Sequence, residues 1–117
     1  MRRPAKFVPG RGDVVILTLD PTQGSEQAGT RPVLVLSPEV YNDKAGRLVC
    51  VPITSKIRND PFELRLPKTS DSTGVVLCDQ LRTLDWIARK PRFIEKLSSE
   101  FFSEVIDRID ALLKDDA

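Results

Sequence analysis

Histidine is absent from this 117-residue sequence, and cysteine occurs only twice, at positions 50 and 78. A chain without histidine and with two widely separated cysteines lacks the usual ligands of a zinc site. It also has no clustered carboxylates of the kind that hold calcium or magnesium. We therefore expect no metal and no other cofactor. Both cysteines lie in apolar stretches, which predicts two small buried side chains rather than a disulfide.

Long apolar runs are missing too. No stretch approaches the roughly 18 residues that a membrane-spanning helix needs. The basic N-terminus, MRRPAK, is not followed by the apolar core of a signal peptide. We expect a cytoplasmic protein that makes no membrane contact. The length allows one domain, residues 1–117, with a single compact core.

The net charge of +1 hides an uneven distribution. Residues 1–96 contain 16 Lys and Arg against 11 Asp and Glu, whereas residues 97–117 contain 2 against 6. A basic body is compatible with a polyanionic partner, although a charge of this size is weak support by itself. The acidic end is typical of a solvated helix face.

Hydrophobic periodicity predicts a mainly β chain that ends in one helix. Residues 33–36 are apolar at every position, which predicts a strand buried on both faces at the centre of a sheet. Residues 62–66 alternate between apolar and charged, as in an edge strand. A short helical turn or loop is expected at 38–46. The complete set of predicted strands is 13–20, 33–36, 47–54, 62–66, 74–77 and 81–84.

From Ser98 onward the apolar residues recur with helical spacing, and Ser98 or Ser99 is the expected N-cap. Six side chains should form the face that packs on the sheet: Phe101, Val105, Ile106, Ile109, Leu112 and Leu113. At least five short strands followed by one helix, in a chain of this length, indicate a small, strongly bent β-barrel.

The most informative segment of the sequence is residues 20–38, DPTQGSEQAGTRPVLVLSP, which joins a polar loop to an apolar strand. Pro32 holds the preceding residue extended, which places Arg31 at the mouth of the strand. Gly24 and Gly29 permit unusual backbone angles on either side of Glu26. We interpret this segment as an active-site loop. The alternative is a hairpin loop whose charges simply face water.

The same segment resembles the signature of the MazF/PemK family of toxin endoribonucleases, the toxic halves of bacterial toxin–antitoxin pairs. The similarity continues in order through Tyr41-Asn42, through VPIT at 51–54, PFE at 61–63 and GVVLCDQ at 74–80. It therefore runs from about residue 8 to the C-terminal helix. The pattern is closer to MazF than to Kid/PemK.

This resemblance implies an SH3-like barrel that forms a homodimer and is silenced by a MazE-like antitoxin. It implies catalytic roles for Arg31, Thr54 and Glu26. Some family members instead use a histidine before the glutamate, with an arginine and an aspartate near Asp79. Here Ser25 and Leu77 stand at the first two of these positions, which shifts the weight to Arg31 and Thr54. Two structural alternatives remain open: Thr54 as an ordinary strand end, and Glu26 as a simple ion-pair partner of Arg31.

Cleavage of a phosphodiester without metal or histidine favours a nucleophile that the substrate supplies, the ribose 2′-hydroxyl, which DNA lacks. Arg31 is suited to stabilising the extra phosphoryl charge, because a guanidinium can bind two oxygens and stays protonated. Thr54 can donate a hydrogen bond to a phosphate oxygen. We therefore expect a sequence-specific, metal-independent endoribonuclease that leaves 2′,3′-cyclic phosphate and 5′-hydroxyl ends, cuts single-stranded RNA and leaves DNA intact.

Unpaired RNA bases are recognised by loop side chains beside the cleavage site. The candidate RNA-binding residues are Gln27, Asn42, Lys56, Arg58, Asp79, Gln80 and Arg82. Trp86 could also stack a base, but its apolar neighbours favour a core or interface position. Two other functions share the expected fold: a CcdB-like toxin that binds gyrase and cuts nothing, and a noncatalytic RNA-binding barrel. A pure binder has no need of the Glu26, Arg31 and Thr54 set.

Overall fold

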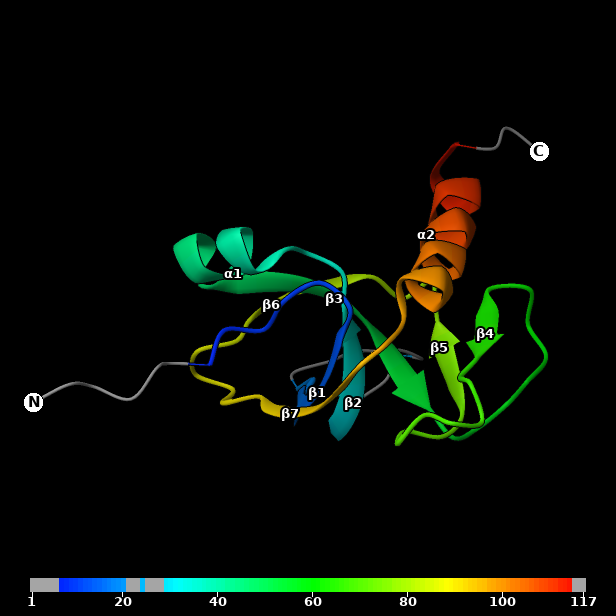
Figure 1. Ribbon diagram of the computed structural model, residues 1–117, viewed down its shortest axis with the longest axis horizontal. Helices are drawn as coiled ribbons and strands as arrows, with labels where there is room; N and C mark the ends of the chain where they lie inside the picture. Colours follow the sequence, from blue (N-terminus) through cyan, green and yellow to red (C-terminus); the bar gives the residue numbers. More distant parts are fainter. Residues whose placement is uncertain (1–6, 21–23, 25–28, 115–117) are drawn as a thin grey trace, which may run out of the picture.

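The computed structural model describes residues 7–20, 24 and 29–114, and it shows a bent β-sheet flanked by two helices (Figure 1). Five strands make up most of one sheet: β1 (Asp13–Thr18), β2 (Thr30–Val35), β3 (Arg47–Thr54), β6 (Arg82–Asp85) and β7 (Arg92–Lys96). β4 (Glu63–Arg65) and β5 (Val75–Leu77) extend it past the end of β3. The helices are α1 (Glu39–Ala45) and α2 (Ser99–Lys114). The mainly β architecture with a C-terminal helix is confirmed.

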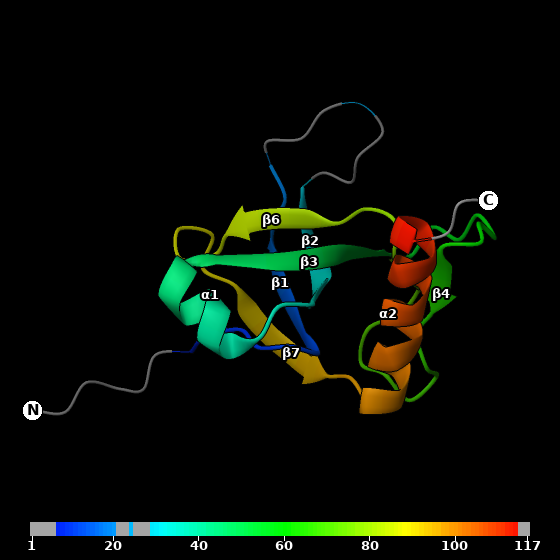
Figure 2. The same ribbon diagram turned by 90° about the horizontal axis from the view of Figure 1, so that it is seen from above.

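β3 is the strand on which the sheet depends. Its first half pairs with β6, its middle with β2 and its last two residues with β5, always antiparallel. The main strand order is β4-β5-β3-β2-β1-β7, with β6 also paired to β3. Figure 2 shows β3 running below both helices from one side of the molecule to the other. Every residue of β3 is therefore paired with at least one neighbouring strand.

Two apolar clusters lie on opposite faces of β2 and β3. One contains Val33 and Cys50 with the buried Trp86, and the other contains Leu34 and Val51. This alternation is the period-two pattern of strands buried on both faces, as predicted for residues 33–36. Both cysteines are buried and free, which confirms the expectation for them.

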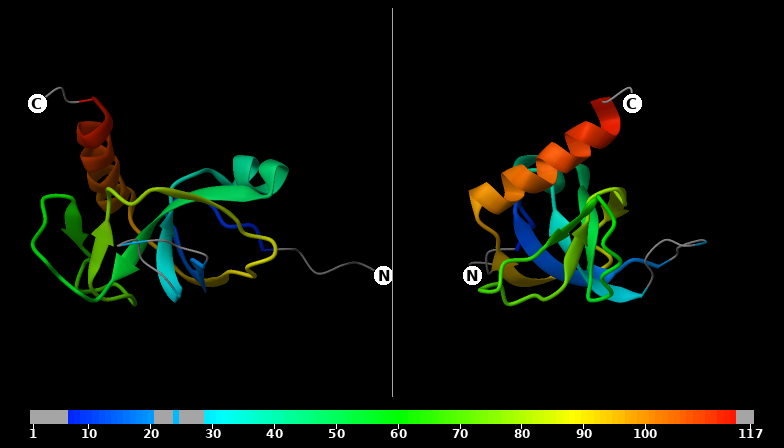
Figure 3. Two further views of the ribbon diagram at one scale, coloured as in Figure 1. Left: turned by 180° about the vertical axis from the view of Figure 1, so that it is seen from behind. Right: turned by 90° about the vertical axis from the view of Figure 1, so that its right-hand side faces the viewer.

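Helix α2 covers the second cluster, and its inclined position over the sheet is clear from the side (Figure 3). The Ser98 hydroxyl accepts the backbone N–H of Phe101 at 3.1 Å, so Ser98 is the N-cap. Phe101, Val105 and Ile109 are buried against the sheet. The prediction for the last turn was wrong, because Leu112 and Leu113 are 39% and 70% exposed. The helix extends beyond the part of the sheet that it covers.

Two further differences from the predictions concern β2 and β7. β2 begins at Thr30, three residues before the predicted strand, and includes Pro32. Pro32 pairs with Ile16 of β1, whereas the pairing of β2 with β3 starts only at Val33. Proline is tolerated here because, among the described residues, one side of the strand has no partner at this position that would need its missing N–H. β7 was not predicted, because the segment RFIEK has adjacent apolar residues and no clean alternation. Among the described helices, none is both long and apolar enough to cross a membrane.

Candidate functional site

Arg31 and Thr54 lie near the same end of two paired strands. Val33, Leu34 and Val35 of β2 pair with Pro52, Val51 and Cys50 of β3. Arg31 and Thr54 each lie two residues beyond the last of these pairs, Val33 with Pro52. Thr54 pairs instead with Val75 of β5, whereas Arg31 pairs with Leu17 of β1.

Thr54 is the last residue of β3 and is only 6% exposed. Its Oγ1 accepts the backbone N–H of Lys56 at 3.2 Å, which fixes the side chain and leaves its O–H to donate. Gly74, at the start of the β5 segment, packs directly on the Thr54 carbonyl group. A Cβ added to Gly74 would lie 2.8 Å from the Thr54 carbonyl carbon and would clash with its oxygen. The backbone φ of Gly74 is +109°, which also favours glycine.

A small cavity of about 80 Å³ opens beside Thr54. Four of the predicted RNA-binding residues line it with Thr54: Lys56, Arg58, Asp79 and Gln80. Arg82 lines an adjoining hollow with Asp79 and Gln80. Residues that are more than 20 positions apart in sequence therefore meet at one end of β3. This grouping is compatible with a site for a charged, polar ligand, with cations on the loop after β3.

Sequence reasoning missed the residue that organises this loop. The Glu63 carboxylate accepts the backbone N–H groups of Arg58 and Asn59, each at 3.0 Å. Asn59 has a positive φ of 59°, so the chain turns tightly around the carboxylate. Glu63 thereby holds the backbone of a predicted RNA-binding residue in place. Its position in the predicted edge strand suggested an ordinary solvent-facing charge, and nothing in the spacing indicated this role.

Asn42 contradicts its predicted role in RNA binding. The side chain has no exposed surface. Its Nδ2 donates to the carbonyls of Pro9 and Ser37 at 2.7 and 3.1 Å, and its Oδ1 accepts the Ser37 hydroxyl at 2.6 Å. The Asn42 carbonyl accepts the indole N–H of Trp86 at 2.9 Å. Asn42 is thus a buried structural residue, and Trp86, which is 3% exposed, belongs to the core and cannot stack a base.

The remaining predicted site residues, Glu26 and Gln27, lie outside the described residues, as does Ser25. Within residues 7–20, 24 and 29–114, no three His, Cys, Asp or Glu side chains gather in a way that could hold a metal ion. Burial raises the pKa of the Cys50 thiol to about 12, and burial likewise raises that of Cys78 to about 11. Neither thiol is therefore suited to act as a nucleophile.

A larger cleft, of about 370 Å³, lies on the other side of the β3 end. Arg31 and Ser55 line it, together with β1, β7 and the loop of residues 67–73. Thr54 and Ser55 are consecutive, so one residue faces the small cavity and the next faces this cleft. The C-terminal end of β3 thus separates two hollows: the small cavity, which is polar, and the larger cleft, which has an apolar floor.

The chain is similar to known proteins over most of its length. A family model described as PemK-like, MazF-like toxin of type II toxin-antitoxin system matches residues 10–113. The Endoribonuclease toxin MazF of Escherichia coli strain K12 is 46% identical over 85 residues, which are 73% of this chain and 76% of that protein.

Solved structures are similar over nearly the full length. A crystal structure of MazF from Deinococcus radiodurans has a TM-score of 0.89 and 39% identity, covering 92% of this chain and 98% of that one. A crystal structure of MazE-MazF from the same organism has a TM-score of 0.82 and 35% identity, covering 93% and 98%. This chain belongs to the PemK-like, MazF-like toxin family of type II toxin–antitoxin systems.

Proposed function

We propose that this chain is the endoribonuclease toxin of a type II toxin–antitoxin system. The family match over residues 10–113 and the endoribonuclease relatives support this function. The observation that supports it at the level of residues is the grouping of Thr54 with Asp79 and Gln80 at one end of β3, where the paired strand β2 carries Arg31. Lys56 and Arg58 add positive charge beside Thr54, where a phosphate backbone would pass.

The proposed reaction is attack of a ribose 2′-oxygen on the adjacent phosphorus. The 2′-O–P bond forms, the P–O5′ bond breaks, and the products carry a 2′,3′-cyclic phosphate and a 5′-hydroxyl. The proton of the 2′-hydroxyl must leave, and the 5′-oxygen must gain one. The step consumes no water and no cofactor. RNA is a substrate and DNA is not, because only RNA has the attacking hydroxyl.

Each residue of the pair has a distinct part in this reaction. Arg31 binds the nonbridging oxygens, whose charge increases in the pentacoordinate state, and donates a proton to the leaving 5′-oxygen only secondarily. The Thr54 hydroxyl donates to a nonbridging oxygen, because its oxygen already accepts the Lys56 N–H. Glu26 is our candidate for taking the 2′ proton or for orienting Arg31.

The remaining predicted residues are proposed to bind single-stranded RNA and to select the cut site. They are Gln27, Lys56, Arg58, Asp79, Gln80 and Arg82. Cutting messenger RNA at a preferred sequence would inhibit translation. A MazE-like antitoxin is the expected partner, by analogy with MazE-MazF of Deinococcus radiodurans. We propose that residues 1–117 act as one domain, and that the toxin is a homodimer in the cytoplasm.

The decisive experiment compares Arg31→Ala, Arg31→Lys and the unchanged protein on a long RNA. After incubation, the ends of all fragments are sequenced and tested for cyclic phosphate. We expect cleavage by the unchanged protein, loss of cleavage with alanine, and partial activity with lysine, which keeps the charge but not the two-pronged geometry. Circular dichroism verifies that each variant is folded. Full cleavage by folded Arg31→Ala would remove Arg31 from the mechanism.

One modified substrate and one change of conditions test the mechanism itself. RNA with 2′-O-methyl groups should resist cleavage, because its 2′-oxygens cannot attack. An excess of chelator should leave the rate unchanged. Cleavage of the methylated polymer, or strict dependence on magnesium, would contradict attack by the 2′-hydroxyl without metal. A folded protein that binds but cuts no RNA would contradict the enzymatic function as a whole.

A further inference from the structure

Apart from Arg31, the residues that line the cleft of about 370 Å³ have no part in the reaction just described. Its size falls within the range of small-ligand sites, roughly 300–1,000 Å³. Its floor is apolar and comes from four separate strands: Ile16 of β1, Pro32 of β2, Ile53 of β3 and Ile94 of β7. We call it the Ile94 cleft. A floor of this kind favours a flat, weakly hydrated group over an ion.

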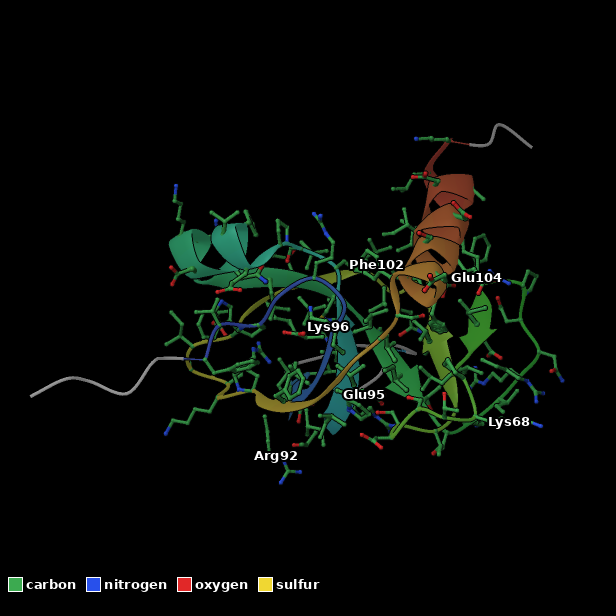
Figure 4. The ribbon with its side chains drawn as sticks, in the orientation of Figure 1. Lys68, Arg92, Glu95, Lys96, Phe102 and Glu104 are labelled. Carbon is green, nitrogen blue, oxygen red and sulfur yellow. The ribbon has the colours of Figure 1, made fainter. Side chains whose placement is uncertain are left out.

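The wall of the Ile94 cleft is polar. Asp71, Ser72 and Thr73, from the loop between β4 and β5, line it. This loop is anchored to β7 by one carboxylate: Glu95 Oε2 accepts the Ser70 hydroxyl at 2.6 Å and the Ser72 N–H at 2.8 Å. Figure 4 labels Glu95 on β7 and Lys68 in the loop between β4 and β5. The wall therefore has a fixed position relative to the floor.

The ionised state of Glu95 suits this anchoring role. Burial alone would raise the pKa of its carboxyl group, but the hydrogen bonds from Ser70, Ser72 and Asp71 outweigh burial and lower that pKa. The carboxylate therefore stays charged at neutral pH. A charged acceptor makes stronger hydrogen bonds than a neutral one, so Glu95 is a firm attachment point for the loop.

A bulge in β7 produces this arrangement. Val14 of β1 pairs with Glu95, but the next residue, Val15, pairs with Phe93, so Ile94 is an extra residue in β7. A bulge changes the direction of the side chains around it. As a result, two consecutive residues serve the same cleft: Ile94 forms floor, and Glu95 anchors the wall.

The chemistry of the cleft indicates its ligand. Asp71 brings a negative charge that offsets the positive charge of Arg31 in the same cleft, and its carboxylate only accepts hydrogen bonds. Unpaired bases are bound by contact with their flat faces and by hydrogen bonds to their edges. Ser55 borders the cleft and directly follows Thr54, so a nucleotide next to the scissile phosphate is within reach. Adenine, cytosine and guanine carry an exocyclic amino group that can donate to a carboxylate, whereas uracil does not.

We propose that the Ile94 cleft binds one unpaired RNA base next to the cut site, that Asp71 selects a base with an amino group, and that Glu95 positions Asp71. This inference rests on the proposed endoribonuclease function. It adds a specificity site formed by Ile94, Asp71 and Glu95, none of which was predicted from the sequence to be a site residue. Asp71 is the reading residue and Glu95 is a positioning residue.

The test is a cleavage profile on a randomised RNA library, read by sequencing fragment ends. The unchanged protein should disfavour uracil at one position beside the cut. Asp71→Asn should reduce this preference by about tenfold, because an amide both donates and accepts and a hydrogen bond to a charged group is lost. The matched control is Asp107→Asn, an exposed carboxylate on α2 outside the cleft, which should leave the profile unchanged.

Glu95 is tested by a pair of variants. Glu95→Ala releases the loop and should weaken the same base preference with little change in the preference at other positions. Glu95→Gln keeps an oxygen that can accept both hydrogen bonds and should restore most of the preference. A residue that only stabilised the fold would change the rate at all sites equally.

The outcomes separate this inference from the proposed function. If the unchanged protein cleaves RNA but Asp71→Asn has the same profile, the base site is wrong and the endoribonuclease stands. If the profile is unchanged and the variant instead binds an antitoxin more weakly, the cleft holds a protein side chain and the inference is overturned. If the unchanged protein cuts nothing, both proposals fail.

Discussion

Replacing Gly74 by alanine should lower both the stability of the fold and the rate of RNA cleavage, although Gly74 has no reacting group of its own. The backbone φ of +109° costs a residue with a side chain about 1–2 kcal/mol. The new methyl group would also lie 2.9 Å from the Ser55 Cα and would meet the Thr54 carbonyl. Forcing atoms into a filled space adds about 1–3 kcal/mol. We expect a total loss in the free energy of unfolding of about 2–5 kcal/mol.

A loss in the middle of this range, about 3–4 kcal/mol, leaves most of the protein folded at 25 °C, because natural domains are stable by about 5–15 kcal/mol. The clash is relieved by moving the end of β3, which carries Thr54. A misplacement of about 1 Å at a reacting group can lower a rate roughly 100-fold. Gly74→Ala should therefore cleave RNA about 100-fold more slowly per folded molecule.

The assay combines urea unfolding at 25 °C with single-turnover RNA cleavage. Gly46→Ala is the matched control: its φ is also positive, at +67°, but a Cβ there would meet only the end of the Ile87 side chain at 3.4 Å. The control should lose about 1 kcal/mol, the cost of a left-handed backbone for a residue with a Cβ, and retain its cleavage rate. Equal destabilisation of the two variants would refute the clash with Thr54. A destabilised Gly74→Ala protein with a normal cleavage rate would refute its link to the reaction.

Three other predictions concern buried groups and pH. Asn42→Ala should lower the free energy of unfolding by about 3 kcal/mol in urea titration, since three buried hydrogen bonds are lost; a loss under about 1 kcal/mol would contradict the buried network. Cys50 and Cys78 should resist iodoacetamide in the native protein at pH 8, because burial blocks access and raises their pKa; labelling as fast as in urea would count against this. Glu95 has a lowered pKa when folded, so its stabilisation is complete above its ordinary value of 4.5 and declines as pH falls through the lower value. Thermal melts of Glu95→Gln should lack this part of the acid dependence, and identical acid profiles would exclude the carboxylate as its source.

Much of the fold could be predicted because burial on both faces leaves a strong signal. The strand at 47–54 was predicted with the bounds that the structure has, since it is bordered by Gly46 and ends where the polar loop begins. β7 gave no such signal, because its bulge breaks the alternation on which strand prediction depends. The exposed end of α2 could not be predicted either. Periodicity reveals which residues share a helix face but not where the neighbouring sheet stops.

The candidate site was predictable in its members more than in its geometry. Motif order pointed to Arg31 and Thr54, but only the pairing of β2 with β3 shows that both lie near the same end of neighbouring strands. Asn42 was predicted to bind RNA because it lies in a polar segment that was expected to form a loop beside the cleavage site. Its burial depends on Pro9 and Trp86, which are 33 and 44 residues away. The local sequence pattern around Asn42 cannot predict contacts between residues that are this far apart in the chain.

The extra residue in β7 has a consequence for how this protein family can diversify. A deletion at Ile94 would leave β7 able to pair regularly with β1, so the barrel would survive. The same deletion would remove Ile94 and with it part of the apolar floor, next to the loop that Glu95 holds. The gain or loss of one codon at this place would therefore change which RNA base the toxin prefers beside the cut site, while its fold stayed the same.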